Sequence, residues 1–121
     1  MRITILAALL AMSLTIPSLV QAAGPNGGQT TVADGHPIEF VSKDKEITFF
    51  VIGEDGKPVD TKNLTARAFV QAGGKTETVT LFPAAPNKLV GTTAVSLVAG
   101  SKVVLSSKIH GHNVQARFET K

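Results

Sequence analysis

The chain has 121 residues, a hydrophobic content of 43% and a net charge of +3 from 12 basic and 9 acidic side chains. This length allows one domain with one modest core, and the composition excludes both a multidomain enzyme and an intrinsically disordered chain. The basic residues are scattered singly and lack aromatic neighbours. A nucleic-acid partner is therefore not expected.

Residues 1–22 have the features of a secretory signal peptide. Arg2 supplies a positive end, residues 3–20 are almost wholly apolar or small, and small residues precede a cleavage point after Ala22. A retained anchor helix is the alternative, but serines and a proline interrupt the apolar run. We expect a periplasmic protein of residues 23–121, whose nearly neutral charge gives no strong membrane binding after cleavage.

The expected mature chain divides into a leader and one domain. Residues 23–34 are predicted to form a flexible Gly-rich leader and a first short strand, and residues 35–121 a β-sandwich domain. Apolar and polar residues alternate with period two, and no segment sustains a helical period. In chain order, the predicted strands cover residues 30–33, 37–41, 46–52, 64–71, 76–82, 88–91, 102–109 and 114–118.

Turn chemistry separates these strands. Residues 54–58 contain Asp-Gly followed by Pro, and Gly73-Gly74 closes a hairpin. Seven to eight short strands with turns about every ten residues predict an all-β fold, an antiparallel two-sheet sandwich of immunoglobulin-like kind. A small barrel is the second choice. The apolar neighbours Phe49 and Phe50 point to opposite faces, which indicates burial on both sides or an interface.

The first candidate site is the pair His110 and His112. Side chains two apart on an extended segment lie on one face, so both imidazoles could reach one cation. The alternative is that Gly111 makes a hairpin turn and both rings are solvated at its tip.

His36 and Glu39 form a second candidate. Pro37 holds His36 extended, which places His36 and Glu39 on opposite faces of a strand, so they cannot chelate one ion without a bulge. In the alternative, His36 begins a strand and Glu39 is a solvated strand residue. A site that joins His36 to His110 and His112 requires the two segments to be neighbours in space.

The available ligands limit the metal. The chain has no Cys, and both Met residues lie within residues 1–22. Imidazole with carboxylate suits Cu(II), Ni(II), Zn(II) or Co(II), whereas a soft-ligand Cu(I) site is excluded in residues 23–121.

Catalytic residues are not expected. No serine lies in a nucleophile-elbow context, Cys is missing, and the aspartates lie where turns need them. The chain is therefore predicted not to be an enzyme.

A set of short segments is spread over nearly all of the expected mature chain: residues 24–28, 35–41, 55–59, 73–75, Leu81 with Pro83-Ala84, 87–91 and 114–118. Together these segments resemble a family of small bacterial periplasmic proteins associated with heavy-metal efflux systems. That family is similar to a β-sandwich domain of some efflux-pump periplasmic adaptor subunits. Relatives often carry His where this chain has Asn26.

The resemblance implies a periplasmic β-sandwich that handles divalent metals or contacts a periplasmic subunit of a metal efflux pump, and His36 and Glu39 match its shared motif. Our first hypothesis is an accessory protein that binds or buffers a divalent transition metal, with His110 and His112 as the core pair and His36 as a third ligand. The second is a metal-free module that docks onto a membrane efflux or envelope complex through a strand edge or the Phe49-Phe50 region.

Overall fold

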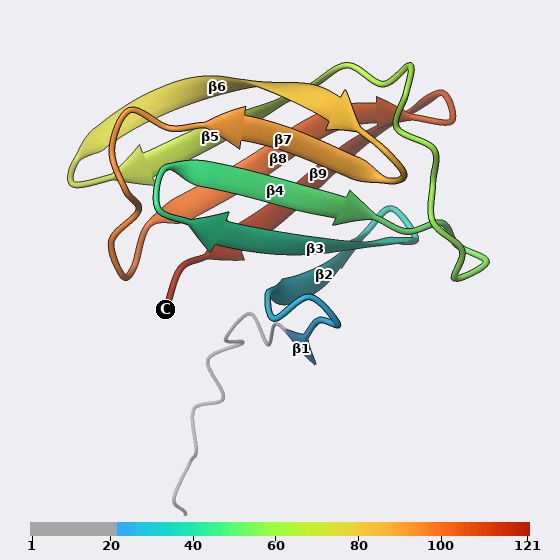
Figure 1. The fold of residues 1–121 in the computed structure, drawn as a ribbon, viewed down its shortest axis with the longest axis horizontal. Helices are drawn as coiled ribbons and strands as arrows, with labels where there is room; N and C mark the ends of the chain where they lie inside the picture. Colours follow the sequence, from blue (N-terminus) through green and yellow to red (C-terminus); the bar gives the residue numbers. More distant parts are fainter. Residues whose placement is uncertain (1–21) are drawn as a thin grey trace, which may run out of the picture.

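Residues 22–121, the part of the chain that the computed structural model describes, contain nine antiparallel strands joined by turns and loops (Figure 1). They are β1 (Ala22–Ala23), β2 (Gln29–Ala33), β3 (His36–Lys43), β4 (Glu46–Val51), β5 (Ala66–Ala72), β6 (Lys75–Ala84), β7 (Lys88–Thr92), β8 (Lys102–Ile109) and β9 (His112–Glu119). Within these residues, no helix is long and apolar enough to cross a membrane. The predicted signal peptide lies outside the described residues, apart from Ala22.

The strands follow the order β1-β2-β3-β4-β7-β6-β5-β8-β9 in one sheet. The sheet bends at β6, because residues 75–81 of this strand pair with β5 and its last three residues, 82–84, pair with β7. The bend brings β2 beside β9. No ladder joins these two strands in residues 22–121, so a seam stays open there.

The fold is therefore all-β and antiparallel, as the alternation predicts, and its sheet is nearly barrel-shaped. The expected two-sheet immunoglobulin-like sandwich is not confirmed. The alternation of apolar and polar residues predicts where the strands lie in the sequence. It does not tell which strand lies on the free side of β2, and that strand decides whether the sheet closes.

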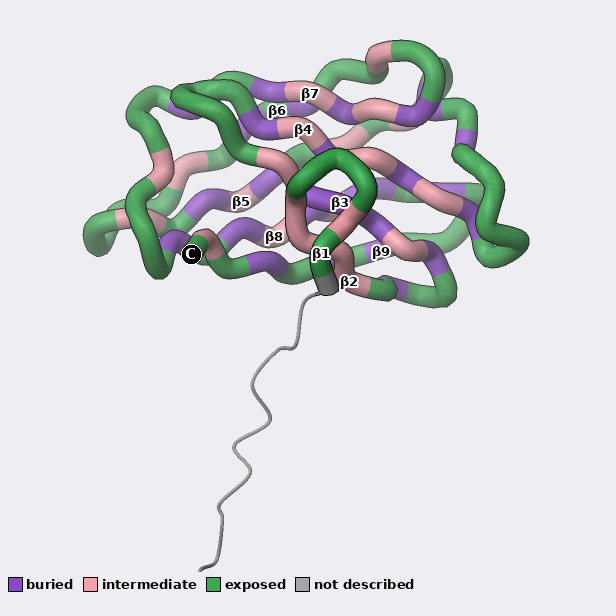
Figure 2. The backbone as a smooth tube through the Cα atoms, turned by 60° about the horizontal axis from the view of Figure 1, so that its bottom comes forward, coloured by how far each residue is buried: buried purple, intermediate pink, exposed green. Residues whose placement is uncertain are grey.

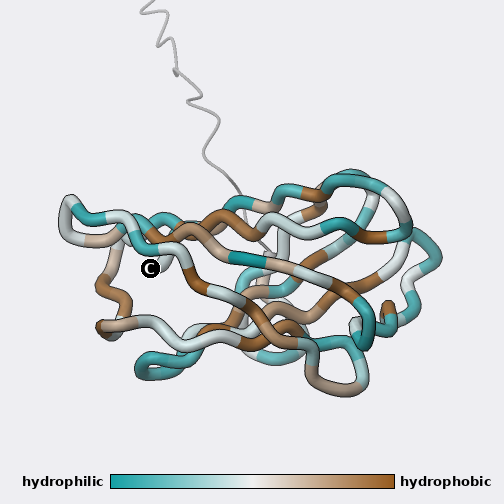
Figure 3. Tube along the Cα trace, turned by 90° about the horizontal axis from the view of Figure 1, so that it is seen from above, coloured by the Kyte–Doolittle hydropathy of each residue, from teal (hydrophilic) through white to brown (hydrophobic). Residues whose placement is uncertain are grey.

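The core is filled by every second residue of the strands. Burial and hydropathy both alternate along the chain, while the loops are mainly exposed (Figures 2 and 3). Ile47, Phe49 and Val51 face inward from β4 and are fully buried, as their spacing predicts. The rings of Phe40, Phe49 and Phe118 meet with centroids 5.2 to 5.8 Å apart, which joins β3 and β4 to the last strand.

Three hairpins close with two-residue turns in which both residues have positive φ. The turn residues are Asp34-Gly35, Gly73-Gly74 and His110-Gly111, with φ between 49° and 80°. This is the geometry of type I′ turns, whose twist matches that of the strands they connect. The predicted hairpin at Gly73-Gly74 is confirmed, and so is the turn at Gly111.

The leader is folded onto the sheet. Ala23 in β1 pairs with Gln29, and the loop between them is closed by hydrogen bonds from Gly24 N to Gly28 O at 2.9 Å and from Gly27 N to Gly24 O at 3.1 Å. The sequence predicts a flexible leader here because glycine adopts many conformations. These bonds describe how the loop is closed, and the flexibility of the leader stays a prediction.

Candidate functional site

Two hairpin turns lie side by side at one end of the sheet, because β2 lies beside β9. The turn between β2 and β3 carries Asp34 and is followed by His36. The turn between β8 and β9 contains His110 and is followed by His112. The rings of His36 and His110 contact each other, with centroids 5.8 Å apart.

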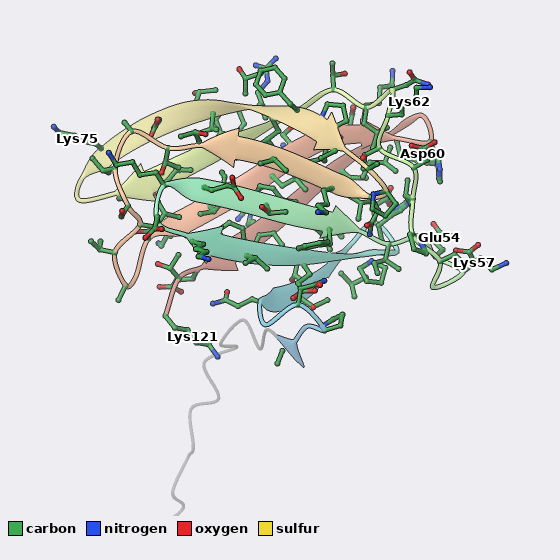
Figure 4. The ribbon with its side chains drawn as sticks, viewed as in Figure 1. Glu54, Lys57, Asp60, Lys62, Lys75 and Lys121 are labelled. Atoms are coloured by element: carbon green, nitrogen blue, oxygen red, sulfur yellow. The ribbon has the colours of Figure 1, made fainter. Side chains whose placement is uncertain are left out.

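A third segment faces these turns. The connection from β4 to β5 folds back on itself, with Gly53 N donating to Lys57 O at 2.8 Å and Val59 N donating to Val51 O at 3.1 Å. Thr61 fixes its far end by donating its hydroxyl to Lys88 O at 2.9 Å. Glu54, Lys57 and Asp60 of this connection project from the same end of the molecule (Figure 4). The predicted turn at residues 54–58 is confirmed.

The three segments line an open cavity of about 560 Å³. All three histidines of the chain line it, together with residues 53–55 and 57–60. Its charged lining, apart from histidine, consists of three acids and one lysine, namely Glu54, Asp55, Asp60 and Lys57. This excess of negative charge favours cations.

His36 is the fixed member of the histidine group. Its side chain is buried, and Nδ1 lies 2.9 Å from the carbonyl oxygen of Asp34. A carbonyl only accepts, so Nδ1 carries the hydrogen, and the lone pair of the neutral ring is on Nε2. Metal-binding histidines commonly have such a backbone partner on their second nitrogen.

His110 and His112 are both exposed, and His112 Nδ1 lies 3.9 Å from Asp34 Oδ2. His110 has a φ of 51° and is the first residue of the turn, whereas His112 begins β9. The two residues therefore do not lie two apart on one face of a single extended strand. The expectation that they do is wrong. The alternative, solvated rings at a hairpin tip, describes their place in the structure.

The described residues 22–121 contain no group of three His, Cys, Asp or Glu side chains positioned to hold one ion as they stand. The three histidines share a cavity, but they do not form a preassembled ligand set.

Glu39 lies apart from this cavity. It occupies the outer face of β3, where the Gly24–Gly28 loop covers it, and it is 2% exposed. Its carboxylate accepts four hydrogen bonds of 2.8 to 3.2 Å, from Asn26 N to both oxygens, from Asn26 Nδ2 and from Gly28 N. β3 pairs with β2 without a bulge, so His36 and Glu39 stay on opposite faces, as the spacing predicts.

The sequence predicts two acidic residues of this end, Asp34 and Glu54, only as turn residues. The carbonyl oxygen of Asp34 accepts a hydrogen bond from His36 Nδ1, and its carboxylate lies 3.9 Å from His112 Nδ1. The Glu54 side chain lies over Gly35, where a Cβ added to the glycine would come within 2.9 Å of Glu54 Oε1. A local pattern cannot reveal either contact, because each depends on segments that are distant in the chain.

Comparison with known proteins identifies no relative: no family model, no curated protein and no solved structure matches this chain.

Proposed function

We propose that this protein binds a divalent transition metal ion in the cavity formed by the two hairpin turns and the β4–β5 connection. One observation carries the proposal: His36, His110 and His112, from distant parts of the chain, line one cavity whose other charged residues are mainly acidic. Imidazole and carboxylate together suit Cu(II), Ni(II), Zn(II) or Co(II).

The three histidines have different roles in this proposal. His36 is the anchor, because burial and its bond to the Asp34 carbonyl hold the ring in one orientation. His110 and His112 are exposed and adjust to the ion when it enters. A site built in this way exchanges its ion readily with solvent or with another protein, which suits buffering or transfer.

The proposed setting is the periplasm, where the protein serves as an accessory to heavy-metal efflux. The signal-peptide pattern of residues 1–22 supports export. The link to efflux, and to a periplasmic pump subunit as partner, rests on the family resemblance.

A calorimetric titration tests metal binding. The purified protein is titrated with Zn(II), Cu(II), Ni(II) and Co(II) beside the double variant His110→Asn, His112→Gln. Asn suits the positive φ of position 110, and Gln keeps an exposed polar side chain at 112, so both replacements preserve the hairpin.

We expect a Kd of about 1 μM or tighter for at least one of these ions, and a loss of about 100-fold or more in the double variant. Thermal unfolding confirms that the variant is folded. Equal affinity in both proteins, or no binding by the wild type, would contradict the proposal.

A metal-free interaction module is the second candidate, because Phe82 is 65% exposed on the outer face of the sheet. Phe82 pairs with Val90, Val90 pairs with Thr48, and Thr48 pairs with Val41, so this row crosses β6, β7, β4 and β3. Val90 and Val41 are half-buried, as is Phe50 of β4. We base the candidate on the exposed Phe82 ring and these partly exposed apolar neighbours.

A photo-crosslinking amino acid placed at position 82 tests this candidate in intact periplasm. A specific adduct with an envelope protein, absent when the crosslinker replaces exposed Glu119 on the opposite part of the sheet, would support it. Identical adduct patterns at the two positions would count against it.

A further inference from the structure

The histidines supply three nitrogen donors to the proposed ion, and four-coordinate ions such as Zn(II) bind one donor more. Four carboxylates lie at this end of the molecule: those of Asp34, Glu54, Asp55 and Asp60. Their hydrogen-bond partners distinguish them.

Asp55 and Asp60 are already engaged in the turns they form. Asp55 Oδ1 accepts a hydrogen bond from Lys57 N at 3.0 Å, and Asp60 Oδ1 accepts one from Lys62 N at 2.9 Å. Hydrogen bonds from a backbone N–H to the side chain of an aspartate two residues earlier in the chain stabilise turns. Reorienting either carboxylate toward an ion would break its turn contact.

Asp34 is placed to orient ligands. Its carbonyl oxygen fixes the ring of His36, and its carboxylate lies 3.9 Å from Nδ1 of His112. Each contact is to a nitrogen that leaves the other ring nitrogen for an ion. Asp34 is therefore suited to positioning the two histidines.

Glu54 differs from the other three. Within residues 22–121, no hydrogen bond or ion pair involves its carboxylate, and its side chain is exposed. The Glu54 side chain extends from the β4–β5 connection over Gly35, which is the residue between Asp34 and His36 in the sequence. A Cβ atom added to Gly35 would lie 3.1 Å from Cδ of Glu54. An unpartnered carboxylate thus already lies beside the turn that carries the anchoring histidine.

We propose that Glu54 is the carboxylate ligand that completes a site of three imidazoles and one carboxylate. This inference rests on the proposed metal binding and specifies how the ion is held. The ion then joins three separate segments, namely the start of β3, the β8–β9 turn and the β4–β5 connection. Glu54 also adds negative charge, which a cation balances on binding.

The variant Glu54→Gln tests this role, and Asp55→Asn is its matched control. Both remove one negative charge from the same cavity wall. The amide oxygen of the control still accepts the hydrogen bond from Lys57 N, so the turn is kept. If Glu54 is a direct ligand, Glu54→Gln weakens binding more than Asp55→Asn does. If Glu54 contributes only its charge, the two variants lose affinity equally.

Zn(II) affinity is measured by calorimetry, and the visible spectrum of the Co(II)-loaded protein reports the ligand set. We expect Glu54→Gln to weaken Zn(II) binding about 10- to 100-fold and to change the Co(II) bands. Asp55→Asn should weaken binding by less than about fivefold and leave the bands unchanged.

The possible results separate this inference from the proposed function. Wild-type affinity with unchanged Co(II) bands in Glu54→Gln, while the double histidine variant fails to bind, would overturn the role of Glu54 and leave metal binding standing. Equal losses in Glu54→Gln and Asp55→Asn would also overturn it, because charge alone would explain them. If the wild type binds none of the ions, both proposals fail.

Discussion

Polar groups gather at two places around β3, namely at Glu39 and at the histidine cavity. The two places differ in how far their carboxylates are buried and hydrogen-bonded. The Glu39 carboxylate is buried under the Gly24–Gly28 loop, and its hydrogen bonds come from Asn26 and Gly28. In the cavity, the Glu54 carboxylate is exposed and, among the described residues, has no hydrogen-bond or ion-pair partner.

This difference distinguishes a structural carboxylate from one that is available to a ligand. A buried carboxylate with its hydrogen bonds satisfied stabilises the fold, and an ion would have to displace the leader to reach it. Exposed donors around a cavity contribute little to stability and can bind a ligand at low cost. Glu39 lies near His36 in the sequence, and Glu54 lies near it in the structure. Distance from His36 alone therefore does not tell which of the two carboxylates is available to a ligand.

The largest effect on stability is expected from Glu39→Ala. It leaves the amides of Asn26 and Gly28 without their acceptor, which should lower the free energy of unfolding by about 3 kcal/mol. Urea denaturation measures this loss. Zn(II) affinity should not change, and a parallel loss of affinity would mean that the two regions are coupled.

Metal binding should raise stability by a similar amount. An ion at 100 times its Kd stabilises the folded state by about 2.7 kcal/mol if it does not bind the unfolded chain. It also joins the β2–β3 and β8–β9 hairpins across the seam, where no ladder connects β2 to β9 in residues 22–121. Urea denaturation with and without Zn(II) measures this gain, which should vanish in His110→Asn, His112→Gln.

Gly35→Ala should have a smaller effect, about 2 kcal/mol. Gly35 has a φ of 77°, which strains an Ala residue. The new Cβ would also come within 2.9 Å of Glu54 Oε1, but this atom ends an exposed, flexible side chain that can move aside at little cost. Gly74→Ala is the control, because Gly74 has the same φ and turn position with nothing within 4 Å of an added Cβ. Thermal unfolding compares the two variants, and equal losses would show that the Glu54 contact contributes nothing.

The smallest effect is expected from His110→Asn alone. Asn followed by Gly is the preferred pair of a type I′ turn, so the free energy of unfolding should rise by about 0.5 kcal/mol. Metal affinity should fall in the same variant. A decrease in stability would show that the ring contact with His36, at a centroid distance of 5.8 Å, outweighs the strain at position 110.

Much of the fold can be predicted from local pattern. Inward residues such as Ile47 and Phe49 follow the period of two, and Gly73-Gly74 marks a hairpin, because both signals act over a few residues. The near closure of the sheet cannot be predicted in this way, since it depends on contact between β2 and β9 from opposite ends of the chain.

The candidate site could be predicted only in part. The sequence identifies the three histidines as the residues of interest, and it places Glu39 on the other face of β3 from His36. It gives no sign that the leader would cover Glu39, or that Glu54 would lie over Gly35. Both contacts join segments that share no sequence pattern.

The sequence by itself determined an all-β chain, the positions of most of its strands and turns, and the absence of Cys and Met from residues 23–121, which leaves imidazole and carboxylate as candidate metal ligands there. These properties follow from side-chain period, turn residues and composition, which are local. Only the tertiary structure decided which donors meet, because His36 and His110 become neighbours when the bent sheet brings β2 beside β9. The same packing buries Glu39 and leaves Glu54 exposed at the cavity.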